Sequence, residues 1–428
     1  MTAPADPPAE RIATLDAVRG FAVLGILLMN IVSMGLPAYA YVDPSYWGLE
    51  GAADLTAWRL NYILADGKMR ALFTMLFGAS MLLIAERAES QVASGGMGPA
   101  ETHYRRIFWL FVFGMIHAWL FWYGDILVHY AIAGALIFPI WRWRVPGLVA
   151  VVVAMAALQL ALNLGHHASL DALRDAARAP GASVEAVAAW QEALRQEVPG
   201  RADAEAEIRG YRGGFGDALA ARVPMTTLFQ TVFIPLGLPE LFLFIALGMI
   251  LFRTGFLTGR WSSRAYAAVI AAGYLIAVPL MIPIAAWNAA ADWDPVLLPL
   301  TDSLSLVLRP FIALAHAALV ILWLRSGRAA WLARRLAAAG RMAFSNYLGT
   351  TLVTTTLFYG YGFGLFAVLS RAELYVVVLG VWLVILLWSE PWLRRHRYGP
   401  LEWVWRSLAR GELVPNAKPA IARQSQAR

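Results

Sequence analysis

His117 and Asp125 are the two side chains whose types and spacing best suit acid–base chemistry. They are eight residues apart, a little over two helical turns, so both could face one cavity. A histidine oriented by a carboxylate is a general base that works near neutral pH. The structural alternative is a histidine bonded to a neighbouring helix, with the aspartate capping the next helix, and spacing alone favours this alternative.

Further ionisable side chains lie within apolar segments, where each carries an energetic cost. Lys68 and Arg70 could extend to the membrane interface or bind an anionic substrate group, and the sequence favours neither interpretation. Arg309 and His316 are seven residues apart and therefore share one helix face. In the functional interpretation they line a site. In the structural interpretation Arg309 forms an ion pair, for which Glu240 is a candidate partner.

Four polar residues complete the set of candidate substrate-binding residues. Asn30 and Asn346 place amides within or beside apolar segments, where such groups also bridge helices. Asp16 and Arg19 precede the first apolar segment. No metal site is predicted, because the chain has no cysteine and its seven histidines lack ligand spacing, apart from one adjacent pair in a loop.

The elements that must position these residues are long apolar runs. Of the 428 residues, 60% are hydrophobic and 15% are charged, and the mean hydropathy is +0.58. A helix of about 20 apolar residues crosses the hydrocarbon core of a bilayer. We therefore predict an all-α polytopic membrane bundle of about ten transmembrane helices, at 21–37, 60–84, 106–122, 126–141, 146–164, 237–252, 265–287, 303–324, 342–360 and 373–389.

The predicted spans divide the chain into two membrane halves around a polar insertion. We expect a cytoplasmic leader at 1–20, a five-helix half at 21–165, an extracytoplasmic helical insertion at 166–224, a second half at 225–410 and a disordered cytoplasmic tail at 411–428. Arginine gathers in every second loop, which places both termini in the cytoplasm. The net charge of +7 is thus explained by arginines beside the membrane spans, which set the orientation in the bilayer, and nucleic acid is not an expected partner.

Several segments together resemble the YeiB-like bacterial inner-membrane proteins. They include residues 11–20, Gly114–His117 with the following Tyr123–Leu127, and the C-terminal segment Gly340–Tyr347. The resemblance extends over nearly the whole chain and matches the 166–224 insertion least well. It implies a C-terminal domain of unknown function, in a family whose members are often labelled transport-associated.

The segment Leu15-Asp16-Ala17-Val18-Arg19-Gly20 also resembles the start of the heparan-glucosaminide N-acetyltransferases and of membrane acyltransferases that decorate sugars. That resemblance implies acyl transfer from a cytoplasmic acyl-CoA to a hydroxyl or amine of a small-molecule, sugar or lipid-linked acceptor. It also implies that His117 is the base or acyl acceptor, although the key histidine of those enzymes need not lie in this span. No tightly bound cofactor is expected.

Two functions follow from these residues. In an acyltransferase, Asp125 orients His117, while Lys68, Arg70 and Arg309 hold an anionic donor group or the developing oxyanion. In a transport-associated protein or permease, the same polar groups form an intramembrane pathway. An enzyme requires a cavity that joins His117 to the cytoplasm, whereas a structural role leaves His117 packed and dry. The lipid bilayer is the expected partner, and homo-oligomerisation stays open.

Overall fold

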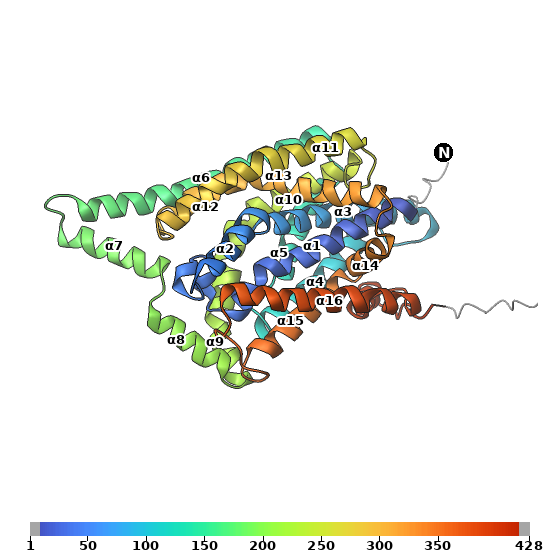
Figure 1. Cartoon of the computed structure of the whole chain (residues 1–428). Helices are drawn as coiled ribbons and strands as arrows, with labels where there is room; N and C mark the ends of the chain where they lie inside the picture. Colours follow the sequence, from blue (N-terminus) through green and yellow to red (C-terminus); the bar gives the residue numbers. More distant parts are fainter. Residues whose placement is uncertain (1–8, 419–428) are drawn as a thin grey trace, which may run out of the picture.

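The computed structural model describes residues 9–418, and this part of the chain is almost entirely helical, which confirms the all-α prediction (Figure 1). Its β-structure is one isolated bridge between His396 and Ala417. The α-helices are α1 (Ala9–Gly35), α2 (Ala52–Leu64), α3 (Lys68–Gln91), α4 (Pro99–Leu120), α5 (Leu127–Ile137), α6 (Val145–Arg178), α7 (Val184–Glu197), α8 (Arg201–Arg212), α9 (Phe215–Leu228), α10 (Ile234–Arg253), α11 (Ser263–Ala271), α12 (Val278–Ala290), α13 (Leu298–Arg325), α14 (Ala330–Arg341), α15 (Ala343–Phe358), α16 (Arg371–Arg395) and α17 (Pro400–Arg410).

Each predicted membrane span coincides with a helix or a pair of helices. Among the described residues, seven helical stretches are long and apolar enough to cross a bilayer: Ala13–Gly35, Ala52–Ser94, Val145–Arg178, Phe215–Arg253, Ser263–Ala290, Leu298–Arg325 and Arg371–Arg395. The other three predicted spans coincide with α4, with the short apolar helix Leu127–Ile140 and with the 16 residues of α15. The count of ten spans therefore stays a prediction.

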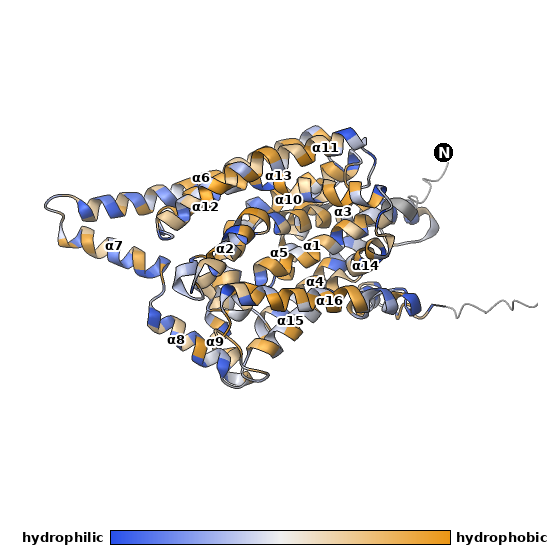
Figure 2. Cartoon of the chain, in the orientation of Figure 1, coloured by the Kyte–Doolittle hydropathy of each residue, from blue (hydrophilic) through white to orange (hydrophobic). Residues whose placement is uncertain are grey.

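Hydrophobic residues predominate along the bundle helices (Figure 2), and many large apolar side chains are exposed on the outside of the bundle. Helix α6 presents Val153 with 62% of its surface exposed, and α16 presents Leu379 and Leu383 in the same way. A protein in water would bury such side chains, but a bilayer solvates them. The exposed apolar surface therefore supports a membrane protein.

Glycines allow the first and fourteenth helices to pack closely. A Cβ on Gly20 would lie 2.0 Å from the carbonyl oxygen of Leu336, and one on Gly340 would lie 1.8 Å from that of Asp16. No side chain fits at either position. The Arg19-Gly20 and Gly340-Arg341 segments thus meet at one helix crossing.

The predicted insertion is partly an extension of the bundle. Helix α6 continues unbroken from the apolar span to Arg178, so the predicted boundary after residue 165 falls inside a helix. Helices α7 and α8 follow and project from one end of the bundle, opposite the end where α1 begins and α16 finishes (Figure 1). Their surfaces are more polar than the bundle (Figure 2).

Three predicted segment boundaries differ from the structure. The span 60–84 is interrupted at Gly67, whose φ of +70° and contact with the Arg309 side chain leave no place for a Cβ. The described part of the leader belongs to α1, and residues 1–8 lie outside the described range. Residues 411–418 of the predicted disordered tail pack against α16 and α17, for example through Lys418 Nζ to the Leu393 carbonyl; 419–428 lie outside the described residues.

Candidate functional site

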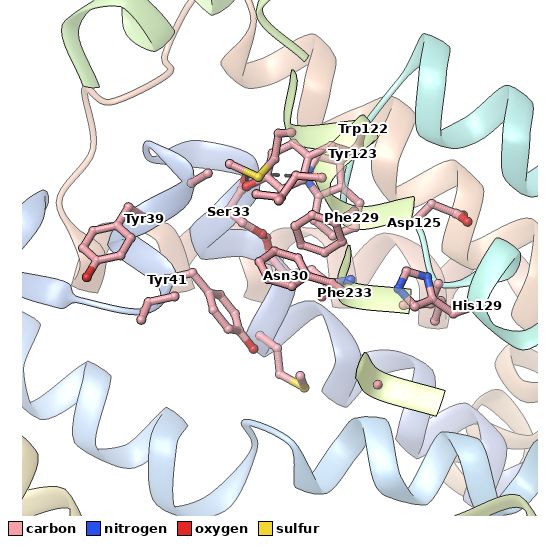
Figure 3. A pocket seen from close by; sticks show the side chains of 18 of the residues that line it. Asn30, Ser33, Tyr39, Tyr41, Trp122, Tyr123, Asp125, His129, Phe229 and Phe233 are labelled. Atoms are coloured by element: carbon pink, nitrogen blue, oxygen red, sulfur yellow. Dashed lines mark hydrogen bonds between the residues drawn. The ribbon is translucent and has the colours of Figure 1, made fainter. Parts of the chain in front are cut away.

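A cavity of about 710 Å³ lies at the end of the bundle that carries the insertion, and we call it the chamber (Figure 3). Helices α1, α5 and α10 form its walls, together with residues from the segment between α1 and α2 and from α7 and α8 of the insertion. Its size falls within the range of pockets that enclose small organic ligands.

One wall of the chamber is apolar and is built by a continuous helix. Between α9 and α10 the helix passes through a π-helical segment, Phe229–Phe233, and both of these terminal phenylalanines line the chamber. Such local widening of a helix is frequent at functional sites. One turn later Gly237 also lines the chamber, and a Cβ at this position would meet no atom within 4 Å.

Polar side chains from three other helices face the same space. Asn30 comes from α1 and His129 from α5 (Figure 3), and Arg70 comes from the first turn of α3. The Arg70 side chain is 39% exposed, and its Nη2 atom lies 3.4 Å from both carboxylate oxygens of Glu240, a weak attachment. The Nδ1 atom of His129 is buried and has no hydrogen-bond partner among the described residues. The chamber therefore combines an imidazole, a loosely held cation and an amide.

The predicted His117–Asp125 pair forms, with Asp125 in the chamber wall and His117 behind it. The Nδ1 atom of His117 is 2.7 Å from Asp125 Oδ1, and its Nε2 atom is 3.0 Å from Thr351 Oγ1. The second carboxylate oxygen of Asp125 accepts the Val128 N–H at 2.8 Å and so caps α5. Both side chains are 2% exposed. Asp125 lines the chamber, whereas both ring nitrogens of His117 are already bonded within the protein.

Arg309 forms the ion pair with Glu240 that the sequence suggested. Its Nη1 and Nη2 atoms lie 2.6 Å from Glu240 and 2.6 Å from Asp302, respectively, and the Arg309 side chain is 4% exposed. Glu240 also lines the chamber beside Arg70. Four charged side chains are therefore linked in a row, in which the buried Glu240–Arg309 pair lies between the partly exposed Arg70 and the exposed Asp302.

Two further predicted residues are fixed by backbone groups. Lys68 is fully buried and donates from Nζ to the Tyr62 carbonyl at 2.6 Å. His316 bonds through Nε2 to the Leu64 carbonyl at 2.8 Å and through Nδ1 to the Tyr274 hydroxyl. Both side chains thereby hold the end of α2 in place, next to the interruption at Gly67.

Three other predicted residues lie towards the opposite end of the molecule. Arg19 bonds to Asp16 at 2.7 Å and to Ser80 Oγ at 2.9 Å. The Asn346 amide donates to Ala339 O and accepts from Trp388 Nε1, so it bridges helices as the structural interpretation expects. None of the three lines the chamber.

The insertion lines one side of the chamber and contacts the bundle beside it. Both carboxylate oxygens of Glu207, on α8, lie 3.1 Å from the Ala38 N–H just after α1, and the Tyr46 hydroxyl donates to the Gly200 carbonyl. Burial raises the pKa of Glu207 to about 7, although the bond to Ala38 opposes this rise. The side chain therefore titrates near neutral pH at a contact between insertion and bundle.

Two chamber residues, His129 and Glu207, lie outside the predicted set, and only His129 carries a local signal in the sequence. His129 is a titratable side chain within a predicted span, four residues after Asp125 and on the same helix face. Glu207 stands in the polar insertion, where its burial depends on long-range packing. Among the described residues, no group of three or more histidine and acidic side chains is arranged to hold a metal ion.

Comparison with known proteins places this architecture in a family. Residues 251–412 match a family described as a protein of unknown function, DUF418. Over 97% of its length the chain is 33% identical to the uncharacterised protein YeiB of Escherichia coli strain K12, all of which is covered. The chain belongs to the YeiB family.

Other YeiB-like relatives match over the same extent. The uncharacterised protein YxaH of Bacillus subtilis strain 168 is 28% identical, with 96% of each chain covered. No solved structure matches the chain. Because these YeiB-like matches span nearly the full length, they include the helices of the chamber as well as the C-terminal domain.

Proposed function

We propose that this YeiB-family protein is a membrane-embedded acyltransferase and that the chamber is where its acceptor and acyl group meet. The observation that carries the proposal is that one apolar-walled cavity brings together His129, Arg70 and Asn30. These are the group types that acyl transfer needs: a proton acceptor and donors for a developing oxyanion. The resemblance of the N-terminal segment to acyltransferases agrees with this chemistry.

The proposed reaction uses the chamber residues in a defined order. The imidazole of His129 accepts the proton of an acceptor hydroxyl or amine while the acceptor atom attacks the carbonyl carbon of an acyl thioester. Arg70 and Asn30 donate hydrogen bonds to the carbonyl oxygen as it gains negative charge. The C–S bond then breaks, and the thiolate takes the proton from the imidazolium, which leaves an ester or amide and a free thiol.

His117 and Asp125 act as positioning residues in this proposal. Asp125 both bonds His117 and caps the helix that carries His129, so this pair fixes where α5 begins. The earlier prediction that His117 is itself the base stays open, and it is tested by the same experiment.

A cytoplasmic acyl donor would have to reach the chamber from the Asp16–Arg19 end of α1. Asp16 and Asn30 are 14 residues apart on α1, which corresponds to about 21 Å. The proposal therefore requires the thioester arm to pass along α1 beyond the close α1–α14 crossing at Gly20 and Gly340, while the acceptor enters beneath the insertion. The pair of Asp16 and Arg19 would lie at the donor entrance.

Cleavage of acyl-CoA by the purified protein tests the proposal. Thiol release is followed with acetyl-CoA and longer acyl-CoA donors for the wild type, His129→Ala, His117→Ala and the matched control His396→Ala, which lies at the far end of α16. Loss of a general base lowers the rate by about 10²–10⁴-fold. The proposal requires this loss in His129→Ala and normal activity in His396→Ala; a folded wild type without thioester cleavage contradicts it.

The buried Glu240–Arg309 ion pair, which lies between Arg70 and the exposed Asp302, favours a second candidate, transport. Charges buried in a membrane bundle commonly mark substrate or proton paths. Substrate uptake into vesicles without thioester cleavage would support this function over acyl transfer.

We further infer an inner-membrane protein with both termini in the cytoplasm and the insertion outside. The absence of cysteine allows a direct test, because any introduced thiol is the sole one in the chain. Ser183→Cys lies in the insertion and Ser326→Cys in an arginine-rich loop, and both positions are exposed. A membrane-impermeant maleimide should label the first and spare the second in intact spheroplasts. The opposite pattern contradicts this orientation.

A further inference from the structure

Arg222 is a buried cation that lacks a counter-charge among the described residues. It belongs to α9, is 1% exposed and donates from Nη1 to the Trp119 carbonyl at 3.1 Å. Its Nε and Nη2 atoms have no hydrogen-bond partner within the described part of the chain. Because an unpaired buried charge costs several kcal/mol, we expect these N–H groups to bind a hydrogen-bond acceptor.

Two buried tyrosines lie beside this guanidinium. The rings of Tyr211, from α8, and Tyr359, just after α15, stack with their centroids 4.5 Å apart, and Arg222 Cζ is 5.8 Å from the Tyr359 centroid. The tyrosines are 1% and 0% exposed, and their hydroxyls interact with each other but form no well-aligned hydrogen bond with another described residue. The cation–π contact compensates only part of the Arg222 charge.

Burial raises the pKa of the Tyr211 hydroxyl, and the charge of Arg222 lowers it. That hydroxyl therefore stays protonated at neutral pH, and both hydroxyls lie within electrostatic reach of the guanidinium. The carboxyl of Glu207 acts on both tyrosines from the same neighbourhood, but it is bonded to Ala38 and its pKa is raised by burial to about 7. Arg222 thus lacks a fully ionised partner in contact.

We propose that Arg222, Tyr211 and Tyr359 bind a small monovalent inorganic anion, such as chloride, between the insertion and the bundle. The guanidinium supplies the charge, and its free N–H groups and the two hydroxyls supply the hydrogen bonds. The enclosure of all three side chains excludes a large ligand, and one positive charge matches a monovalent ion. The ion would join α8 and α9 to the end of α15, and the proposal does not depend on acyl transfer.

Thermal unfolding of the detergent-solubilised full chain tests the anion site. The Tm is measured in chloride, bromide and gluconate at constant ionic strength. We expect the Tm to rise with chloride and bromide and to saturate, because an ion that binds only the folded state stabilises it. Tyr359→Phe should raise the half-saturating chloride concentration about tenfold. Tyr361→Phe, a neighbouring and more exposed tyrosine, is the matched control and should behave as the wild type.

Arg222→Gln should abolish the chloride response. If this variant does not fold, the double variant Tyr211→Phe/Tyr359→Phe decides the question, because it removes two hydroxyls and leaves the rings. Equal Tm values in chloride and gluconate for the wild type would overturn the proposal. Water would then be the partner of the Arg222 N–H groups and the two tyrosine hydroxyls. An unchanged chloride response in the folded variants would overturn it as well, since the ion would then bind elsewhere.

Discussion

The Gly237→Phe substitution tests the role of the chamber without disturbing the fold that surrounds it. A Cβ at Gly237 meets no atom within 4 Å, so the phenylalanine ring can enter the chamber without moving the backbone. Glycine inside a helix is about 0.5–1 kcal/mol less favourable than alanine, and the substitution recovers part of this difference. The free energy of unfolding should therefore stay within about 1 kcal/mol of the wild type.

The same ring occupies space that a ligand in the chamber needs. Overfilling a packed site costs about 1–3 kcal/mol. This cost corresponds to a loss of about 5- to 150-fold in kcat/KM for thioester cleavage, since 1.4 kcal/mol is about tenfold. The assay is thiol release by purified protein, with Tm measured on the same samples.

Gly380→Phe is the matched control. Gly380 lies in α16, is exposed on the outside of the bundle, and its Cβ position is equally open. It should leave both activity and Tm unchanged. Normal kcat/KM in a folded Gly237→Phe protein would refute the assignment of the chamber as the reaction site.

Three further predictions concern stability. Arg309→Met removes the 2.6 Å ion-pair partner of Glu240 and Asp302 and should lower the free energy of unfolding by about 3–5 kcal/mol. Arg328→Met, in an exposed loop, should leave the free energy of unfolding nearly unchanged in the same denaturation series. Gly340→Ala should cost about 1–3 kcal/mol in thermal unfolding, because its Cβ would lie 1.8 Å from a carbonyl oxygen; an equal effect of Gly349→Ala, whose Cβ is unobstructed, would contradict this reasoning. Because the pKa of Glu207 is raised to about 7 in the folded protein, its contribution to stability is greatest below about pH 4.5 and is lost as the pH rises through about 7. The loss is at most about 3 kcal/mol. In a pH series of Tm values, Glu207→Gln should remove this pH-dependent contribution.

The helices could be predicted from the sequence because a membrane span leaves a local signal. Twenty apolar residues and flanking arginines identify a helix without knowledge of its neighbours. The interruption at Gly67 cannot be predicted locally, because the close contact that excludes a Cβ there is with the Arg309 side chain, from a distant part of the chain. The extension of α6 to Arg178 was missed because its polar outer part lacks an apolar signal.

The candidate site shows the same division between local and distant causes. The His117–Asp125 pair was predictable because eight residues separate its members. The hydrogen bond from His117 to Thr351 joins residues 234 apart, and it occupies Nε2, the second ring nitrogen of His117. The pairing of Arg70 with Glu240 joins residues 170 apart. The chamber arises from such distant approaches, so only its individual residues could be anticipated.

Protection of a single thiol inside the chamber tests the central claim most directly. Gly237→Cys introduces a sole cysteine that faces the open space, and Ser326→Cys provides an exposed thiol away from it. The rate of alkylation is measured with and without a saturating acyl-CoA. The proposed reaction site predicts that acyl-CoA slows alkylation at position 237 and leaves position 326 unchanged. Equal rates at position 237 with and without acyl-CoA would contradict the claim.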